Sequence, residues 1–436
     1  MADPKQTARR IFQKTLASID IPLMMERRLI RYGQHFQVDN WACDLSKMSD
    51  VRVVAVGKAT HAMLQGFAQL FPDLQFRGVA SAPTPPEHPL PNVSYFVGGH
   101  PLPNEASFGA AHAALSLLQR CSEKTFVVFL LSGGGSALME LPLNPEQSLE
   151  DTRALNQLLV TCGASIDEIN AVRKHTSAIK GGRLAVTAAN ATQLSLAITD
   201  VPHGKESALA SGPTIHDPTT AADVSRILEQ YRLREMLPRT VRDWFASPEV
   251  PETPKKDHAA FEKAHFSLLL TSHDLFHVAH HAAEEEGFTA CCDNSTDDWP
   301  LERAVGYLLG QLKELQLANP GRRVALISDG EVSSVVTGSG IGGRNSAFVL
   351  ACVEKIAGKP ITVLSVGTDG IDGNSPGAGA VADGSTLTRG NSKGLSPEDF
   401  FARSDSFSFF EKLGDAIVTG PTGNNLRDLR ILLACP

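Results

Sequence analysis

Unbroken apolar runs of strand length recur along the first half of the chain, separated by stretches with helical spacing of apolar residues. The clearest runs cover residues 51–56, 126–131 and 194–198. Runs without polar alternation are typical of strands buried on both faces of a parallel sheet. Strands that alternate with helices indicate βαβ units. The pattern therefore predicts an α/β fold built on a parallel sheet.

The second half repeats this alternation after a break in composition. Residues 247–258 are rich in proline and charge and poor in large apolar groups, as linkers often are. Further strands are predicted at 266–271, 324–327, 332–337 and 361–366. Before the first sheet, apolar positions at helical spacing predict two helices between residue 3 and about residue 37. We therefore expect two domains, residues 1–250 and residues 259–436.

Composition narrows the class of protein. The chain has 436 residues, 42% of them hydrophobic, and a formal net charge of −8. Such a balance disfavours a general surface for nucleic acid or for anionic membranes. The seven cysteines are scattered without a C-x-x-C pair, which indicates free thiols rather than a zinc site or a disulfide framework. With no signal-peptide core and no membrane-length apolar run, we expect a cytoplasmic protein with no membrane partner. The sequence leaves open whether the protein forms a homo-oligomer.

The strand over residues 126–131 leads directly into a glycine-rich turn bounded by two serines. Backbone N–H groups in such a turn form a concave anion site, and the serine hydroxyls add donors. Ligands of open α/β sheets bind at this end of the strands. The alternative is a tight strand-to-helix turn that binds nothing. The predicted phosphate-binding residues here are Ser132, Gly133, Gly134, Gly135 and Ser136.

Charged residues also follow predicted strands. Lys58 lies between the strand over 51–56 and a helix, a place suited to a phosphate, although a surface lysine is the alternative. It is not a P-loop lysine, because Arg52 occupies the position where that motif requires glycine. Asp200 and Asp369 follow strands and are candidates for binding magnesium or for a general base. The four cations Arg173, Lys174, Lys180 and Arg183 are either a solvated helix face or a cluster facing phosphate.

A second glycine-rich segment, residues 338–343, formally fits G-x-G-x-x-G between a strand and a helix. That motif would suit a nicotinamide or flavin dinucleotide, but no acid lies about twenty residues further on. Arg344 follows in the first turn of the helix, where its guanidinium could bind a phosphoryl group or a carboxylate bidentately. The histidines between 273 and 281 lack a cysteine or acidic partner, so a metal role for them is disfavoured.

Taken together, glycine-rich turns and acids at strand ends in both halves suit a site that holds several phosphates, a divalent cation and a small acid. Phosphoryl transfer needs mainly positioning and neutralisation of charge, which such groups provide. A serine nucleophile is less favoured, because 134–136 does not fit G-x-S-x-G. A non-catalytic protein that binds phosphorylated metabolites is a further alternative. Nucleotide-binding residues predicted in the second half are Gly342, Gly343, Thr368, Asp369 and Gly370.

Six segments, spread in order over nearly the whole chain, resemble the class II glycerate kinases, a family with a C-terminal module called MOFRL. The segments are Leu131–Leu138, Asn170–His175, Ser211–Thr214, Gly342–Asn345, Thr368–Gly373 and Thr419–Asn424. The resemblance implies a Rossmann-like N-terminal domain, a smaller α/β C-terminal domain with the MOFRL module at about 321–432, and an active site in the cleft between them.

The resemblance further implies phosphorylation of D-glycerate at its 2-hydroxyl by ATP with Mg²⁺, giving 2-phosphoglycerate and ADP. Lys58 and Arg344 match the lysine and arginine that the family is thought to use, and Asp200 is the third predicted catalytic residue. Asp200 and Asp369 are the predicted Mg²⁺ ligands. An NAD(P)H-dependent hydroxypyruvate reductase is the alternative enzyme. The chain departs from the family pattern at His203–Lys205 and at Asn374–Pro376.

Overall fold

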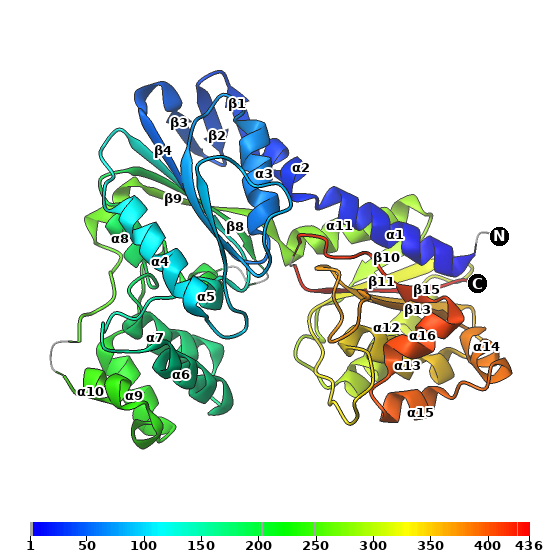
Figure 1. The fold of residues 1–436 in the computed structure, drawn as a ribbon. Coiled ribbons are helices and arrows are strands. Elements are labelled where there is room, and N and C mark those ends of the chain that lie inside the picture. Colours follow the sequence, from blue (N-terminus) through cyan, green and yellow to red (C-terminus); the bar gives the residue numbers. More distant parts are fainter. Residues whose placement is uncertain (1–2, 200, 202–203, 248–249, 425) are drawn as a thin grey trace. The chain divides into compact units, whose positions relative to one another are not determined.

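A computed structural model describes residues 3–199, 201, 204–247, 250–424 and 426–436 (Figure 1). The chain divides into two compact units. The central unit comprises Ile21–Leu270, and the terminal unit combines Met1–Asp20 with Thr271–Pro436. This division differs from the predicted boundaries at 250 and 259. Strand β9 (Ala264–Thr271), beyond the predicted linker, joins the sheet of the central unit, and helix α1 (Pro4–Ser18) packs in the terminal unit.

The central unit is built on a six-stranded sheet in the order β6-β5-β4-β7-β8-β9. Its strands are β4 (Asp50–Val56), β5 (Arg77–Ala82), β6 (Val93–Val97), β7 (Thr125–Leu131), β8 (Thr192–Thr199) and β9. All pairs from β6 to β8 are parallel. In chain order the strands read 3-2-1-4-5-6, the order of doubly wound dinucleotide-binding folds. The predicted Rossmann-like parallel sheet is therefore confirmed.

Alternate residues of β4 and β7 face two separate cores. Val54 and Phe129 belong to a cluster that includes the alanine-rich face of α4 (Glu105–Leu118). On the other face, Phe126 lies 5.7 Å from Phe36, ring centroid to ring centroid, and Phe36 in turn contacts Phe71, which follows α3 (Thr60–Leu70). Because both faces are covered, polar alternation along these strands would cost stability, which explains their unbroken apolar runs.

Phe36 belongs to a small antiparallel sheet that the sequence analysis did not predict. After α2 (Ile21–Arg28) the chain forms β1 (Leu29–Tyr32), β2 (His35–Val38) and β3 (Trp41–Asp44). The predicted second helix therefore ends at Arg28. A helical layer follows β7 and β8. Its helices are α5 (Gly135–Leu138), α6 (Leu149–Thr161), α7 (Ile166–Thr176), α8 (Arg183–Thr187), η2 (Glu206–Ser211), α9 (Ala221–Gln230), η3 (Arg234–Met236) and α10 (Arg239–Ala246).

The terminal unit has a mixed six-stranded sheet in the order β10-β11-β15-β12-β13-β14. The strands are β10 (Thr289–Cys292), β11 (Val324–Asp329), β12 (Ile361–Gly367), β13 (Gly379–Asp383), β14 (Ala416–Ile417) and β15 (Asp428–Ala434). Only β10 and β11 pair in parallel; β15 runs antiparallel between β11 and β12. The predicted strand at 332–337 is wrong: Ser333 makes an isolated bridge, and Val335 is 84% exposed.

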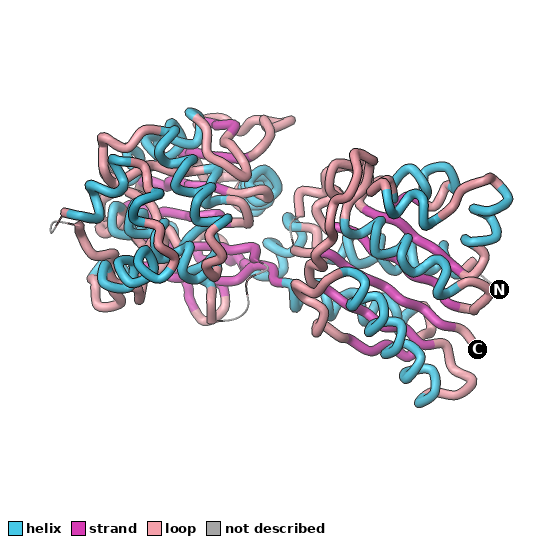
Figure 2. The backbone as a smooth tube through the Cα atoms, turned by 90° about the horizontal axis from the view of Figure 1, so that it is seen from below, coloured by secondary structure: helices cyan, strands magenta, loops and turns pink. Residues whose placement is uncertain are grey.

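Two helix layers cover this sheet. Helices α12 (Leu301–Ala318) and α13 (Arg344–Ile356) pack on one face, with α14 (Thr386–Ser392), α15 (Pro397–Ala402) and α16 (Ser406–Leu413) near them, and α1 and α11 (Ser272–Glu285) pack on the other (Figures 1 and 2). Lys5 of α1 forms an ion pair with Asp415 at 3.0 Å, and Arg10 forms one with Glu286 at 2.8 Å. None of the helices in the described ranges is long and apolar enough to cross a membrane.

Candidate functional site

Two turns meet at the carboxyl ends of β4 and β7, where the strand order of the central unit reverses. The N–H of Ser132 donates to the carbonyl of Val56 at 3.0 Å, and the N–H of Lys58 donates to the carbonyl of Gly133 at 2.9 Å. The N–H of Ala59 donates to Oγ of Ser132 at 3.0 Å. Ligands of doubly wound sheets bind at this switch point. The structure thus brings together two turns that the sequence marked separately.

Glycine is required in both turns. Gly57 has φ +127°, and a Cβ there would lie 2.1 Å from Oγ of Ser132. Gly134 has φ +83°, and a Cβ there would lie 3.1 Å from the His100 ring and 3.4 Å from Cγ of Lys58. The side chains of His100 and Lys58 therefore lie against the backbone of Gly134. Glycine therefore allows the two turns and these side chains to lie this close together.

The turn after β7 contains backbone N–H groups that are available as hydrogen-bond donors. Within the part of the chain that the structure describes, the N–H groups of Gly134 and Gly135 donate to no protein acceptor. Gly134 lies beside the cationic Lys58. Partial burial, and secondly the charge of Lys58, lower the pKa of His100 and so favour its neutral ring. Backbone donors beside a lysine suit a phosphate or carboxylate.

The two serines of this turn have different surroundings. Ser132 is fully buried, so its side chain joins the turns and does not face a ligand. Ser136 is half-buried, and its Oγ lies 2.7 Å from Oγ of Ser211, which in turn donates to Oδ1 of Asn170 at 3.0 Å. Asn170 and Ser211 were noticed in the sequence only as parts of longer segments. Their contact depends on the fold of η2 and α7, which single-sequence patterns do not give.

Two of the four predicted cations at 173–183 lie neither on a solvated helix face nor in an open cluster that faces phosphate. Lys174 is buried and pairs with Asp217 at 3.2 Å. Lys180 is buried and pairs with Glu140. Each lysine is held by an acid distant in sequence, which is the condition for burying a charge. Both earlier interpretations are therefore wrong for these two lysines.

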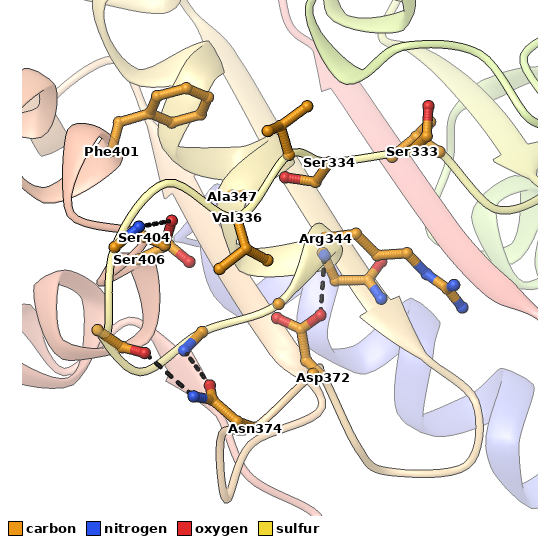
Figure 3. A pocket seen from close by; sticks show the side chains of 18 of the residues that line it. Ser333, Ser334, Val336, Arg344, Ala347, Asp372, Asn374, Phe401, Ser404 and Ser406 are labelled. Carbon is orange, nitrogen blue, oxygen red and sulfur yellow. Dashed lines mark hydrogen bonds between the residues drawn. The ribbon is translucent and has the colours of Figure 1, made fainter. Parts of the chain in front are cut away.

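A cavity of about 650 Å³ lies in the terminal unit at the start of α13 (Figure 3). The segment that leads from β11 to α13 forms much of its wall, with Val335 and Val336 largely exposed. Asp369 and Phe401 also line it. The misassigned strand at 332–337 is thus a wall of this cavity.

The N-terminus of α13 is already occupied by a protein carboxylate. Asp372 accepts a hydrogen bond from the N–H of Asn345 at 2.9 Å, drawn as a dashed line in Figure 3. It also accepts from the N–H and Oγ of Ser346 at 2.8 and 2.6 Å. In a dinucleotide fold, the pyrophosphate would occupy this position. A phosphate there would compete with Asp372 for the same N–H donors.

The glycine-rich segment before α13 also uses its amides within the protein. The N–H of Gly340 donates to the carbonyl of Arg403 at 3.1 Å, and that of Gly342 donates to Oδ1 of Asn374 at 2.9 Å. The N–H of Gly343 donates to Oγ of Ser346 at 3.2 Å. Phosphate binding by Gly342 and Gly343 stays a prediction, but these two amides have protein acceptors.

Arg344 is held by two carboxylates. Its Nε and Nη2 donate to the two oxygens of Asp428 at 2.5 and 3.2 Å, and its Nη1 donates to Glu331 at 2.6 Å. Burial disfavours the charged guanidinium, but Asp428 and Glu331 raise the pKa of Arg344 overall. Three of its five N–H groups are thereby engaged, so a ligand would meet a fixed guanidinium whose charge is partly neutralised.

The other predicted residues of the terminal unit follow β12. Thr368 is buried, with Oγ1 donating to the carbonyl of Arg427 at 2.7 Å. Asp369 lines the cavity and accepts from the N–H of Ile371 at 3.0 Å. Gly370 has φ +86°, and a Cβ there would lie 2.0 Å from the carbonyl of Gly420.

Predicted metal ligands are only partly described. Asp200 and His203 lie outside the described residues. Among the described residues, no group of three or more histidines, cysteines or acids could hold a metal ion. Mg²⁺ in kinases is bound by one or two carboxylates together with substrate phosphates, so such a site needs no protein cage. Asp369 therefore stays a predicted Mg²⁺ ligand.

Comparison with known proteins assigns the family. One family model, described as a domain of unknown function (DUF4147), matches residues 7–246, and the MOFRL family model matches 324–428. Glycerate 2-kinase of Pyrococcus horikoshii is 35% identical over 414 residues, which cover 93% of this chain and 90% of that protein. The chain belongs to the class II glycerate kinase family. The resemblance found from the sequence is confirmed.

Two further relatives carry different names. The crystal structure of a glycerate kinase from Thermotoga maritima matches with a TM-score of 0.84 and 31% identity, covering 99% of both chains. A protein of Agrobacterium vitis named a putative hydroxypyruvate reductase is 34% identical, covering 98% of this chain and 94% of that one. The fold assignment thus extends over the whole chain, while the relatives carry two names for activity.

Proposed function

We propose that the protein phosphorylates D-glycerate at its 2-hydroxyl with ATP, giving 2-phosphoglycerate and ADP. The observation that carries the proposal is the pair of joined turns at the switch point of the central unit. Lys58 and the N–H groups of Gly134 and Gly135 lie together there and match what a transferring phosphoryl group needs. The kinase names of relatives over the same length support it.

The residues take the following parts in this proposal. The amides of Gly134 and Gly135 hold phosphate oxygens, and Lys58 neutralises charge that develops on the phosphoryl group. Arg344 stays a proposed catalytic residue, acting from the fixed position that Asp428 gives it. Asp200 and Asp369 stay the proposed Mg²⁺ ligands, and either could orient the substrate hydroxyl. Mg²⁺ would supply further neutralisation of phosphate charge.

The reductase alternative is supported by the name of the Agrobacterium relative and by the G-x-G-x-x-G match at 338–343. The geometry of that segment argues against it, because Asp372 fills the helix N-terminus and because several loop amides are already bonded. We therefore keep the kinase as the proposed function.

One experiment separates the two activities. The purified protein is incubated with D-glycerate, ATP and Mg²⁺, and in parallel with hydroxypyruvate and NADH. We expect ADP release that depends on glycerate and no oxidation of NADH. NADH oxidation without ADP release would refute the proposal, and ligand binding without either reaction would favour a non-catalytic protein.

A further inference from the structure

Three polar side chains from separate elements form a hydrogen-bonded chain in the central unit. Oγ of Ser136, at the start of α5, lies 2.7 Å from Oγ of Ser211 at the end of η2. Oγ of Ser211 donates to Oδ1 of Asn170 on α7 at 3.0 Å. Ser211 is fully buried and Asn170 is 5% exposed, whereas Ser136 is half-buried. Only Ser136 can therefore meet a ligand.

The direction of these bonds follows from the number of hydrogens. A hydroxyl has one hydrogen, and that of Ser211 is used on Asn170. The hydrogen between the two serines must then come from Ser136. Ser136 is left with lone pairs only, so it accepts hydrogen bonds from a ligand and donates none. An ionised phosphate oxygen cannot donate, so the side chain of Ser136 is poorly suited to the phosphate role first predicted for it.

The backbone around Ser211 is held in an unfavourable conformation. Ala210, Ser211 and Gly212 have φ of +49°, +58° and +62°, a left-handed turn that costs about 1 kcal/mol or more at each non-glycine residue. The N–H of Gly181 donates to the carbonyl of Ser211 at 3.0 Å, and the N–H of Gly182 to that of Gly212 at 2.7 Å. Strain of this kind persists only where surrounding structure imposes it. Here it fixes the hydroxyl of Ser211 against Ser136.

We propose that Ser136 accepts a hydrogen bond from the 3-hydroxyl of D-glycerate and so selects acids that carry this hydroxyl. The inference rests on the proposed function. The chain ends on an amide oxygen, which takes up no proton, so it suits a hydroxyl that keeps its hydrogen during the reaction. The 2-hydroxyl loses its proton to the reaction and needs a base instead. Ser136 is therefore a specificity residue, and Ser211 and Asn170 are positioning residues.

The test compares D-glycerate with D-lactate, which lacks the 3-hydroxyl. Dissociation constants are measured calorimetrically for both acids, together with kcat/KM for D-glycerate. In Ser136→Ala we expect affinity for D-glycerate to fall about tenfold, as for loss of one hydrogen bond, while affinity for D-lactate stays within about twofold. Ser122→Ala, an exposed serine before the opposite end of β7, is the matched control and should change neither.

The positioning role has its own test. Asn170→Asp keeps an acceptor for Ser211, so the preference for glycerate over lactate should be retained. Asn170→Ala frees the hydroxyl of Ser211, and the preference should fall about threefold. Thermal unfolding of each variant checks folding.

Three outcomes would overturn the inference. Equal losses for both acids in Ser136→Ala would indicate a structural effect, and no loss would exclude the contact. If Asn170→Asp and Asn170→Ala behave alike, the bond direction is wrong. Absence of glycerate-dependent ADP release by the unaltered protein would refute the proposed function itself, a result distinct from these.

Discussion

Replacing the carboxylate of Asp372 at the start of α13 tests how much this group stabilises the terminal unit. Asp372 accepts from three donors, the N–H of Asn345 and the N–H and Oγ of Ser346. In Asp372→Asn one oxygen becomes an NH₂ group that faces a donor. The loss is at least one charge-assisted bond, about 1.5–3 kcal/mol, and the interaction of the charge with the helix terminus, about 0.3–1 kcal/mol. We expect unfolding of the terminal unit to become easier by about 2–4 kcal/mol.

The assay measures unfolding of the terminal unit alone. Trp299 packs against its core, whereas Trp41 and Trp244 belong to the central unit. Fluorescence in a background with Trp41→Phe and Trp244→Phe therefore reports denaturant unfolding around Trp299. Glu314→Gln, an exposed exchange of charge for amide within α12 of the same unit, is the control and should cost less than about 0.5 kcal/mol. A similarly small cost for Asp372→Asn at pH 7.5 would contradict the view that the carboxylate of Asp372 stabilises this helix terminus.

Three further predictions concern the central unit. Lys58→Ala should lower kcat for glycerate phosphorylation at least about 100-fold with an unchanged unfolding midpoint, and full activity would remove Lys58 from the mechanism. Gly134→Ala should cost about 1–2 kcal/mol of stability, because φ is +83°, and should weaken ATP binding in a calorimetric titration. Burial lowers the pKa of the fully buried His175, so the unfolded chain binds the proton more readily. Stability should therefore fall as pH drops below about 6.5, and His175→Asn should reduce that fall in denaturant titrations at pH 5 and 7.5.

The sequence predicted the central sheet well because burial on both faces leaves a strong local signal. The strands at 51–56 and 126–131 and the glycine turn between 132 and 136 are found where the apolar runs and glycines indicated. The residues at 332–337 carry the same β-branched signal but line a cavity, since nothing local distinguishes an exposed valine from a buried one.

The partners of charged and polar groups could not be predicted. Arg344 and Asp428 are far apart in sequence, as are Lys180 and Glu140, and their pairing depends on the folded topology. The glycine segment at 338–343 matched a nucleotide motif, yet only the structure shows that Asp372 takes the place of the phosphate.

The position of the transferred phosphate tests the account most directly. D-glycerate, ATP and Mg²⁺ are incubated with the protein, and the product is identified by ³¹P NMR and by its direct conversion with enolase, which accepts 2-phosphoglycerate. We predict 2-phosphoglycerate in equal amount to ADP. A different phosphorylated product, or no product while hydroxypyruvate is reduced by NADH, would contradict the proposed function.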